Sequence, residues 1–248
     1  MDNQYKMLAD ALAASASPVF LTGAGMSTES GIPDFRSATG IYSKGVGEEV
    51  FDIAHFRRDP SFFYKYARQL MLSARNARPN AGHRAIAALE HEFHKNVTVA
   101  TQNIDTLHQR AGSTRVHPIH GTLDTCTCQQ CEDKVGGKEV WRRVQNGEIP
   151  PRHKGCGGIL KPDIVFFGEE LPYDAVAASE KAISEADLLV VAGTSLVVYP
   201  AALLPVARPS SCRLAILNRT PTDLDTEAAV VIRDPLGQTL ADAVQHLR

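Results

Sequence analysis

The sequence lacks the features that mark membrane, nucleic-acid-binding and secreted proteins. Its longest apolar runs, such as residues 188–193, are far shorter than the roughly 18 residues of a membrane-spanning helix. No block of like charge stands out, and 26 basic against 28 acidic residues leave a formal charge of -2. Residues 1–17 contain no basic stretch followed by an apolar one. We therefore expect a soluble cytoplasmic protein with no membrane partner and no direct nucleic-acid partner.

Cysteine and tryptophan are also scarce, with five cysteines and one tryptophan. Four cysteines lie between Cys126 and Cys156, whereas Cys212 precedes an apolar segment, where packing is its ordinary role. An odd number of cysteines that includes a Cys-x-x-Cys pair favours metal binding over disulfides in a cytoplasmic chain. Residues 123–160, which also hold Trp141 and several glycines, are typical of an insertion with its own small core.

Apolar segments of two kinds alternate along the chain. The sequence predicts strands at residues 19–21, 97–101, 115–119, 164–167, 188–192, 214–217 and 229–232, and helices at residues 3–14, 59–72, 79–93, 106–111, 174–184, 200–207 and 236–247. The strands are continuously apolar rather than alternating, which indicates a parallel sheet covered on both faces. Residues 37–50, rich in glycine and serine, predict a long mobile loop that acts as a lid.

We therefore predict an α/β protein with a Rossmann-like, doubly wound parallel sheet and a smaller helical, metal-binding insertion domain. The chain of 248 residues, 44% of them hydrophobic, is long enough to bury such a core. The predicted division assigns residues 1–36, 75–121 and 161–248 to the larger domain. It assigns residues 37–74 and 122–160 to the smaller one.

Residues 18–37 predict a strand that leads into a nucleotide pocket. Gly23, Ala24 and Gly25 follow the strand, and glycines there let the backbone approach a ligand, while a following helix offers N–H groups to phosphate. The fingerprint of dinucleotide-dependent dehydrogenases is not met, because Thr28 stands at its third glycine position. The segment therefore predicts a dinucleotide site of another kind, although a Gly-x-Gly after a strand is also consistent with a simple tight turn.

Polar or glycine residues follow most of the predicted strands. In parallel sheets, ligands bind beyond the carboxyl ends of the strands. We therefore expect these residues to gather at one edge of the sheet: residues 23–25, 102–105, 120–121, 193–195 and Asn218.

Five segments of the chain, most of them at this edge, closely resemble motifs of the sirtuins, which are NAD-dependent protein-lysine deacylases. The segments stand in the family's order and at about its spacing, over nearly the whole chain. They are residues 23–37, 101–105, 120–121, 164–169 and 193–196.

The resemblance implies an enzyme that transfers the acetyl group of acetyl-lysine to ADP-ribose and releases nicotinamide. It implies NAD and a zinc ion as cofactors and acetylated proteins or peptides as substrates. The implied catalytic residues are His120, as the base that activates a ribose hydroxyl, with Asn103 and Asp105 holding the nicotinamide amide and the ribose. The other implied cofactor-binding residues are Gly23, Ala24, Gly25, Ile32, Asp34, Phe35, Arg36, Gln102, Ile104, Gly193, Thr194, Ser195 and Asn218.

By the same resemblance, the segment 165–168 and Val197 bind the substrate. The peptide would add as a strand by main-chain hydrogen bonds, and its acyl-lysine side chain would enter an apolar tunnel. These substrate-binding residues are Val165, Phe166, Phe167, Gly168 and Val197. A buried strand with a turn at Gly168 explains the same apolar residues without any substrate.

Simpler structural roles also fit several of the candidate residues. The ordinary pKa of an imidazole suits a base at neutral pH, but a single histidine after a strand is commonly structural. Asp105 fits a helix N-cap, and Asn218 fits a turn residue. It is their place in the family's motifs that favours the catalytic and binding roles.

The residues after the cofactor loop predict a preference for uncharged acyl groups. Family members that prefer succinyl or malonyl groups carry a Tyr-x-x-Arg there. Tyr64 matches the tyrosine, but Ala67 stands where the arginine belongs. Arg68 lies one position further, about 100° around the helix, and should point away from that face.

The implied metal site departs from the family's two Cys-x-x-Cys pairs. Cys128 and Cys131 form the first pair, and His153 and Cys156 stand at the second. Histidine is an ordinary zinc ligand, so these four residues would make a closed, structural zinc site. Two alternatives stay open: Cys126 as the fourth ligand, although it lies close to Cys128, and a member of the family that has lost zinc.

Three other functions fit parts of the sequence. A mono-ADP-ribosyltransferase would share the NAD site, but His120 together with the acyl-lysine-binding residues 165–168 disfavours it. A zinc-ribbon interaction module with an inactive Rossmann-like domain predicts the loss of Asn103, Asp105 or His120, and all three are present. The failed fingerprint opposes a dehydrogenase.

Overall fold

The computed structural model describes residues 3–34, 40–41 and 47–248, and its larger sheet consists of six parallel strands. The order across the sheet is β3 (Val116–Pro118), β2 (Thr98–Thr101), β1 (Pro18–Thr22), β7 (Leu188–Ala192), β8 (Arg213–Leu217) and β9 (Val230–Ile232). The chain fills one half of the sheet outward from β1 and the other half outward from β7. The predicted fold class is therefore confirmed, with the reversal of strand order between β1 and β7.

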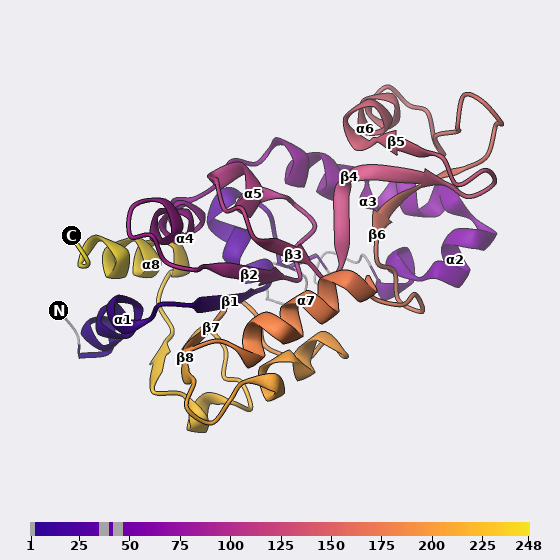
Figure 1. Cartoon of the computed structure of the whole chain (residues 1–248). Coiled ribbons are helices and arrows are strands. Elements are labelled where there is room, and N and C mark those ends of the chain that lie inside the picture. Colours follow the sequence, from indigo (N-terminus) through magenta and orange to yellow (C-terminus); the bar gives the residue numbers. More distant parts are fainter. Residues whose placement is uncertain (1–2, 35–39, 42–46) are drawn as a thin grey trace.

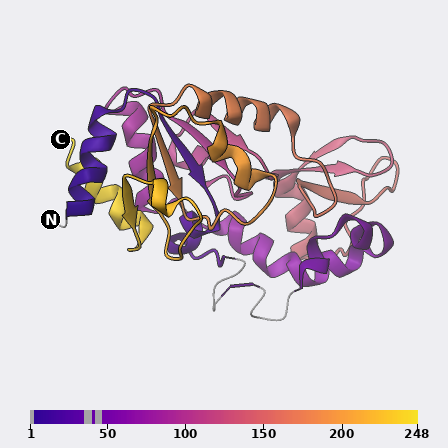
Figure 2. The same cartoon turned by 90° about the horizontal axis from the view of Figure 1, so that it is seen from below.

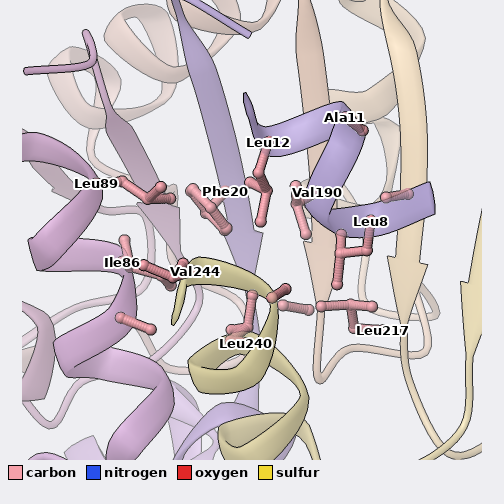
Figure 3. Packing of buried hydrophobic residues seen from close by; sticks show 14 of the residues in the cluster. Leu8, Ala11, Leu12, Phe20, Ile86, Leu89, Val190, Leu217, Leu240 and Val244 are labelled. Atoms are coloured by element: carbon pink, nitrogen blue, oxygen red, sulfur yellow. The ribbon is translucent and has the colours of Figure 1, made fainter. Parts of the chain in front are cut away.

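Two apolar layers cover the faces of this sheet, because successive strand residues point to opposite sides. Phe20 packs with α1 (Asn3–Ala14), α4 (Ala81–His91) and α8 (Leu236–Gln245), as Figure 3 shows for Leu12, Ile86 and Leu240. The neighbouring Val19 and Leu21 belong to the opposite core, with residues of α7 (Tyr173–Ser184) and the 3₁₀ helix η4 (Ala201–Ala207). Helices α1, α4 and α8 lie together near both labelled chain ends (Figure 1).

A second sheet of three antiparallel strands lies at the other end of the molecule (Figures 1 and 2). Its central strand is β4 (Gly121–Cys128), flanked by β5 (Lys134–Gly136) and β6 (Leu160–Ile164). Helix α6 (Gly137–Gln145) supplies Val140 to a small core with Cys126, Cys128 and Leu160, so the expected core of this stretch is confirmed.

An aromatic cluster joins this sheet to the helices that precede β2. Helices α2 (Ile53–Arg58) and α3 (Pro60–Asn76) follow a short 3₁₀ helix, η3 (Glu48–Phe51). Phe63 and Tyr64 of α3 are fully buried, and the ring of Tyr64 lies 5.8 Å from that of Trp141. Asp59 caps α3 by accepting from the backbone N–H groups of Ser61 and Phe62, which explains its start at Pro60.

The predicted strand at residues 164–167 is wrong in extent and in partner. β6 ends at Ile164 and pairs antiparallel with β4, outside the parallel sheet. The next residues leave the sheet because Phe167 exchanges backbone hydrogen bonds with the η3–α2 segment, donating to Phe51 and accepting from Ile53. Tertiary pairing has overridden the local preference of an apolar run.

Other predicted bounds differ less. The glycine turn leads into a 3₁₀ helix, η1 (Ala24–Ser30), rather than an α-helix, and the predicted helix at 200–207 is the 3₁₀ helix η4, which contains Pro205. The predicted loop at residues 37–50 lies mostly outside the described residues, and its end forms η3. The remaining elements are α5 (Leu107–Ala111) and η5 (Asp225–Glu227).

No helix in the described part of the chain combines the length and apolar character that a membrane crossing requires.

A buried pair of histidines, one on α4 and one on α5, lies near the carboxyl end of β1. The rings of His83 and His108 are 4.7 Å apart, and both side chains are inaccessible to solvent. His83 Nδ1 accepts from the backbone N–H of Asn80, and His108 Nε2 lies 3.0 Å from Thr22 Oγ1. Burial lowers the pKa of His83 to about 4 and holds the pKa of His108 well below its ordinary value. Both rings are therefore neutral in the folded protein at pH 7.

These histidines should make the protein lose stability between pH 6.5 and pH 4. In that window a histidine in the unfolded chain binds a proton, whereas buried His83 in the folded protein stays neutral. The free energy of unfolding therefore decreases as the pH falls. At pH 4.5 the shift of His83 corresponds to about 2 kcal/mol of free energy of unfolding. His83→Gln removes this titration, so its denaturant midpoint should fall less than that of the wild type between pH 7 and pH 4.5.

The matched control is His246→Gln, which removes an exposed histidine. It should lose stability with pH as the wild type does. An equal loss in His83→Gln and the wild type would contradict the proposed origin of this acid sensitivity.

Candidate functional site

A cleft of about 500 Å³ opens at the carboxyl edge of β1, β2, β7 and β8, between the parallel sheet and the segment after β6. Most of the residues predicted to gather at this edge line it, but Gly23 and Gly121 do not. Its lining includes the predicted residues Ala24, Gly25, Ile32, Asp34, Gln102, Asn103, Ile104, Asp105, His120, Val165, Phe166, Phe167, Gly168, Gly193, Thr194, Ser195, Val197 and Asn218.

One predicted cofactor-binding residue lies elsewhere, and two fall outside the described residues. Gly23 is not part of the lining: a β-carbon on it would lie 2.6 Å from Thr194 Cβ, so its absence of a side chain lets the two loops touch. Gly25 packs in the same way against Gly193, whose φ is +68°. Phe35 and Arg36 lie outside the described residues.

A network of hydrogen bonds joins Asn103 and Asp105 through Ser27, a residue that sequence reasoning did not select. Asn103 Nδ2 donates to the carbonyl of Gly23 at 2.9 Å and to Ser27 Oγ at 3.2 Å. Ser27 Oγ in turn donates to Asp105 Oδ2 at 2.5 Å. The only sequence signal for Ser27 is its place inside the glycine motif.

Asp105 is not the N-cap of α5, because Thr106 occupies that position, but its side chain bonds to the first residue of the helix. Its Oδ1 accepts from the backbone N–H of Leu107, while its Oδ2 accepts from the Ser27 hydroxyl. Burial raises the pKa of Asp105, and these two hydrogen bonds oppose that shift. The carboxylate is thus fixed in orientation at the wall of the cleft.

His120 follows β3 and presents one ring nitrogen to the protein. Nδ1 lies 3.0 Å from the carbonyl oxygen of Gln102, which only accepts, so we assign the proton to Nδ1. Burial lowers the pKa of His120, and the bond to Gln102 partly offsets that effect. A neutral ring protonated on Nδ1 leaves Nε2 as the nitrogen able to receive a proton.

The side of the cleft near β6 is apolar. Phe51 of η3 and Leu70, Met71 and Ala74 of α3 line it, and sequence reasoning selected none of these four. At the mouth, Phe167 is 41% exposed and Val197 is 54% exposed, which is unusual for such large apolar side chains. An apolar channel that ends in exposed apolar residues suits an uncharged, extended ligand.

The opposite end of the cleft is polar. Asn218 donates to the carbonyl of Thr220 at 2.9 Å, so it is a turn residue that also lines the cleft. Arg219, which sequence reasoning did not select, brings a cation to this end. Gln102 Nε2 donates to Thr194 Oγ1 at 3.1 Å, which ties the loop after β2 to the loop after β7.

The predicted metal ligands lie together at the tip of the smaller sheet. The ligand atoms of Cys128, Cys131, His153 and Cys156 are all within 4.8 Å of one another. Cys156 Sγ lies 3.4 Å from Cys128 Sγ and 3.3 Å from His153 Nδ1. Four such atoms fit around a zinc ion with bonds of about 2.0–2.3 Å, and the set leaves no open position, as in a structural site.

Cys126 is not part of this group. It points into the small core, fully buried, and burial raises the pKa of its thiol to about 12. A thiol that resists losing its proton is a poor zinc ligand.

The comparisons with known proteins agree with this geometry. The family model described as the Sir2 family matches residues 23–200. A protein named NAD-dependent protein deacetylase 2, from Caldanaerobacter subterraneus subsp. tengcongensis, is 41% identical over 96% of this chain and 94% of its own.

Solved structures give the same result. A Sir2 structure with a deacetylated p53 peptide and 3'-O-acetyl ADP-ribose is 38% identical, covers 98% of each chain and has a TM-score of 0.91. A Sir2 structure with a p53 peptide and NAD+ is 39% identical, covers 97% of each chain and has a TM-score of 0.87.

His153→Ala should remove most of the zinc from the purified protein and lower its unfolding temperature, because three remaining ligands hold the ion less well and the ion contributes on the order of 10 kcal/mol to local folding. Metal content measured by mass spectrometry, together with thermal unfolding, checks this. Cys126→Ala is the matched control and should keep its zinc. Zinc lost from Cys126→Ala but kept by His153→Ala would reverse the ligand assignment.

Proposed function

Because the chain belongs to the Sir2 family, the sirtuins, we propose that its cleft binds NAD and an acetyl-lysine peptide side by side and transfers the acetyl group to ADP-ribose, with release of nicotinamide. The family membership predicted from the motifs is confirmed. The observation that carries the proposal is that His120, the Ser27–Asn103–Asp105 network and the 165–168 segment open into one cleft. The deacetylase name of the relative and the NAD+ and peptide in the Sir2 structure support it.

The residues around the cleft fit the two ends of NAD. Asn103 and Asp105, locked through Ser27, would hold the nicotinamide amide and its ribose, with Ile32 against the ring. At the polar end, Ser195 would contact phosphate and Asn218 the adenosine ribose. Assignment of Phe35 and Arg36 to the cofactor loop remains a prediction, as does a contact through Gly23.

When bound, NAD supplies an electrophilic ribose carbon and the hydroxyl on which a base acts. His120 is the base: its Nδ1–H is held by the Gln102 carbonyl, and its Nε2 receives the hydroxyl proton. The lowered pKa keeps the ring neutral at neutral pH, so Nε2 is free to accept the hydroxyl proton. The apolar walls near α3 exclude water and thereby protect the acyl transfer from competing reactions.

The substrate peptide would lie across the mouth of the cleft as an added strand between Gly168 and Val197. Such addition uses main-chain hydrogen bonds and makes few demands on the peptide sequence. The acyl-lysine side chain would pass Val165 and Phe167 into the apolar channel. A protein side chain that captured ADP-ribose instead would have no use for this channel, which favours the deacetylase over the mono-ADP-ribosyltransferase.

Three further expectations belong with this proposal. The separation of the three-stranded sheet from the parallel sheet supports the predicted domain division, with residues 37–74 and 122–160 in the smaller domain, and moves the end of that domain to Ile164, because β6 belongs to the smaller sheet. None of the five cysteines forms a disulfide, which supports a reducing, cytoplasmic location. The nearly balanced charge supports the absence of a direct nucleic-acid partner.

His120→Tyr should lower turnover of NAD and an acetyl-lysine peptide by about 10³-fold, because it removes the base. The measurement is nicotinamide release together with deacetylated peptide by mass spectrometry. Thermal unfolding should show that the variant remains folded, and His246→Gln should turn over normally. Nicotinamide release without deacetylation by the wild type would indicate ADP-ribosyl transfer and contradict the proposal.

The pH profile gives a second readout of the same base. Because burial lowers the pKa of His120, the acid limb of kcat/KM in the wild type should have its midpoint below pH 6.5. A midpoint above that value would mean that another group limits the rate.

Acetyl-lysine peptides should be deacylated at least about tenfold more efficiently than succinyl-lysine peptides. A succinyl carboxylate would lie beside Leu70, Met71 and Ala74, where none of the described residues of α3 that line the cleft is a cation, and its burial there is costly. Ala67 is buried, and Arg68 is not part of the lining, as the helix geometry predicts. The kcat/KM values for two otherwise identical peptides check this, and equal or greater efficiency with succinyl-lysine would contradict it.

A further inference from the structure

Lys161, on β6, is a buried lysine that lies outside the cleft lining. Its side chain is 8% exposed, and Nζ lies 2.8 Å from Glu169 Oε2, 2.9 Å from the carbonyl of Ile164 and 3.3 Å from that of Pro162. Nζ also lies 4.4 Å from the centroid of the Phe166 ring, in cation–π range. Three oxygens and one ring thus fix the ammonium group beside the acyl-lysine segment, which we define as residues 165–169.

Glu169 closes this segment on itself. Its Oε2 takes both Lys161 and the backbone N–H of Phe166, the latter at 2.9 Å, while its own N–H donates to the carbonyl of Phe166 at 3.0 Å. Between them, Gly168 has a φ of +88°, which favours glycine. The ion pair therefore spans a turn whose first and last residues it contacts directly.

The rest of the acyl-lysine segment is fixed by the backbone. Val165 donates to the carbonyl of His120 at 2.9 Å, and Phe167 is paired with Phe51 and Ile53. Among the described residues, the Val165 carbonyl and both backbone polar groups of Gly168 have no backbone partner. These groups are the ones that an added peptide strand would use.

We propose that Lys161 and Glu169 are positioning residues for the acyl-lysine substrate: the pair sets the shape of the 165–169 turn so that its unpaired backbone groups meet the peptide. This inference rests on the proposed deacetylase function. Stability alone does not account for the pair, because a buried ion pair contributes little net stability relative to apolar residues of the same volume. If the ion pair holds the backbone that receives the peptide in one geometry, both the burial of the pair and the hydrogen bond from Phe166 N–H to Glu169 are explained.

The test compares steady-state kinetics of Lys161→Met with those of the wild type, using the p53 acetyl-lysine peptide. Methionine keeps an unbranched apolar stem of similar size but removes the ammonium group that contacts Glu169 and the Phe166 ring. The KM for peptide should rise about tenfold, whereas kcat and the KM for NAD should change less than about twofold, since only the peptide edge moves. Lys161→Arg keeps the charge and should stay within about threefold of the wild-type KM.

Two further variants separate positioning from folding. Lys95→Met removes another lysine that bonds two backbone carbonyls, those of Ala13 and Ser15, at the far edge of the sheet, and it should leave the peptide KM unchanged. The double variant K161M/E169Q leaves no unpaired charge, so it should unfold near the wild-type temperature and still show the raised peptide KM.

The outcomes distinguish this inference from the proposed function. An unchanged peptide KM in Lys161→Met, or an equal rise in the KM for NAD, would overturn the inference while leaving the deacetylase intact. If the wild type released no nicotinamide, the function would fail. Direct titration of the peptide without NAD would then decide the inference: tenfold weaker binding by Lys161→Met supports it, and equal or undetectable binding in both proteins rejects it.

Discussion

The contact between the loop after β1 and the loop after β7 is the constraint on which the rest of the cleft depends. β1 and β7 are neighbours at the point where the strand order reverses, so their outgoing loops diverge and leave a crevice. Gly23 and Gly25 lie against Gly193 and Thr194 with no room for a β-carbon. Any larger residue at these positions would push the two loops apart. It would also disturb the side chain of Asn103, which donates hydrogen bonds to the carbonyl of Gly23 and to Ser27 Oγ.

The base and the substrate edge are linked by one backbone hydrogen bond. The carbonyl of His120 accepts from Val165, so the residue that carries the imidazole also holds the start of the acyl-lysine segment. On the other side, Phe167 pairs with the η3–α2 segment. The peptide edge is therefore tied at one end to the residue that carries the base and at the other to the η3–α2 segment.

Much of the fold could be predicted from sequence because the signals are local. The apolar run of β1, the glycines after it and the start of α1 each act within a few residues, and the common edge followed from parallel strands alone. The path of residues 165–167 could not be predicted, because an apolar run fits a strand equally well and its fate depends on Phe51 and Ile53. Ser27 was missed for a similar reason: its role exists only where segments around 23, 103 and 105 meet. The choice between His153 and Cys126 as the fourth zinc ligand was likewise open in sequence. Spacing does not tell that the Cys126 thiol packs into the small core with Val140 and Leu160.

The pairing of β1 with β7 also bears on how the protein is made. Pro18 and Leu188 are partners, so β1 is synthesised long before the strand that completes its second edge. A chain emerging from the ribosome therefore carries β1 with β2 on one side only until residue 192 has been translated. Such non-local pairing slows folding and exposes an apolar edge meanwhile. The crevice needs both strands, so it cannot form before residue 192 has been synthesised.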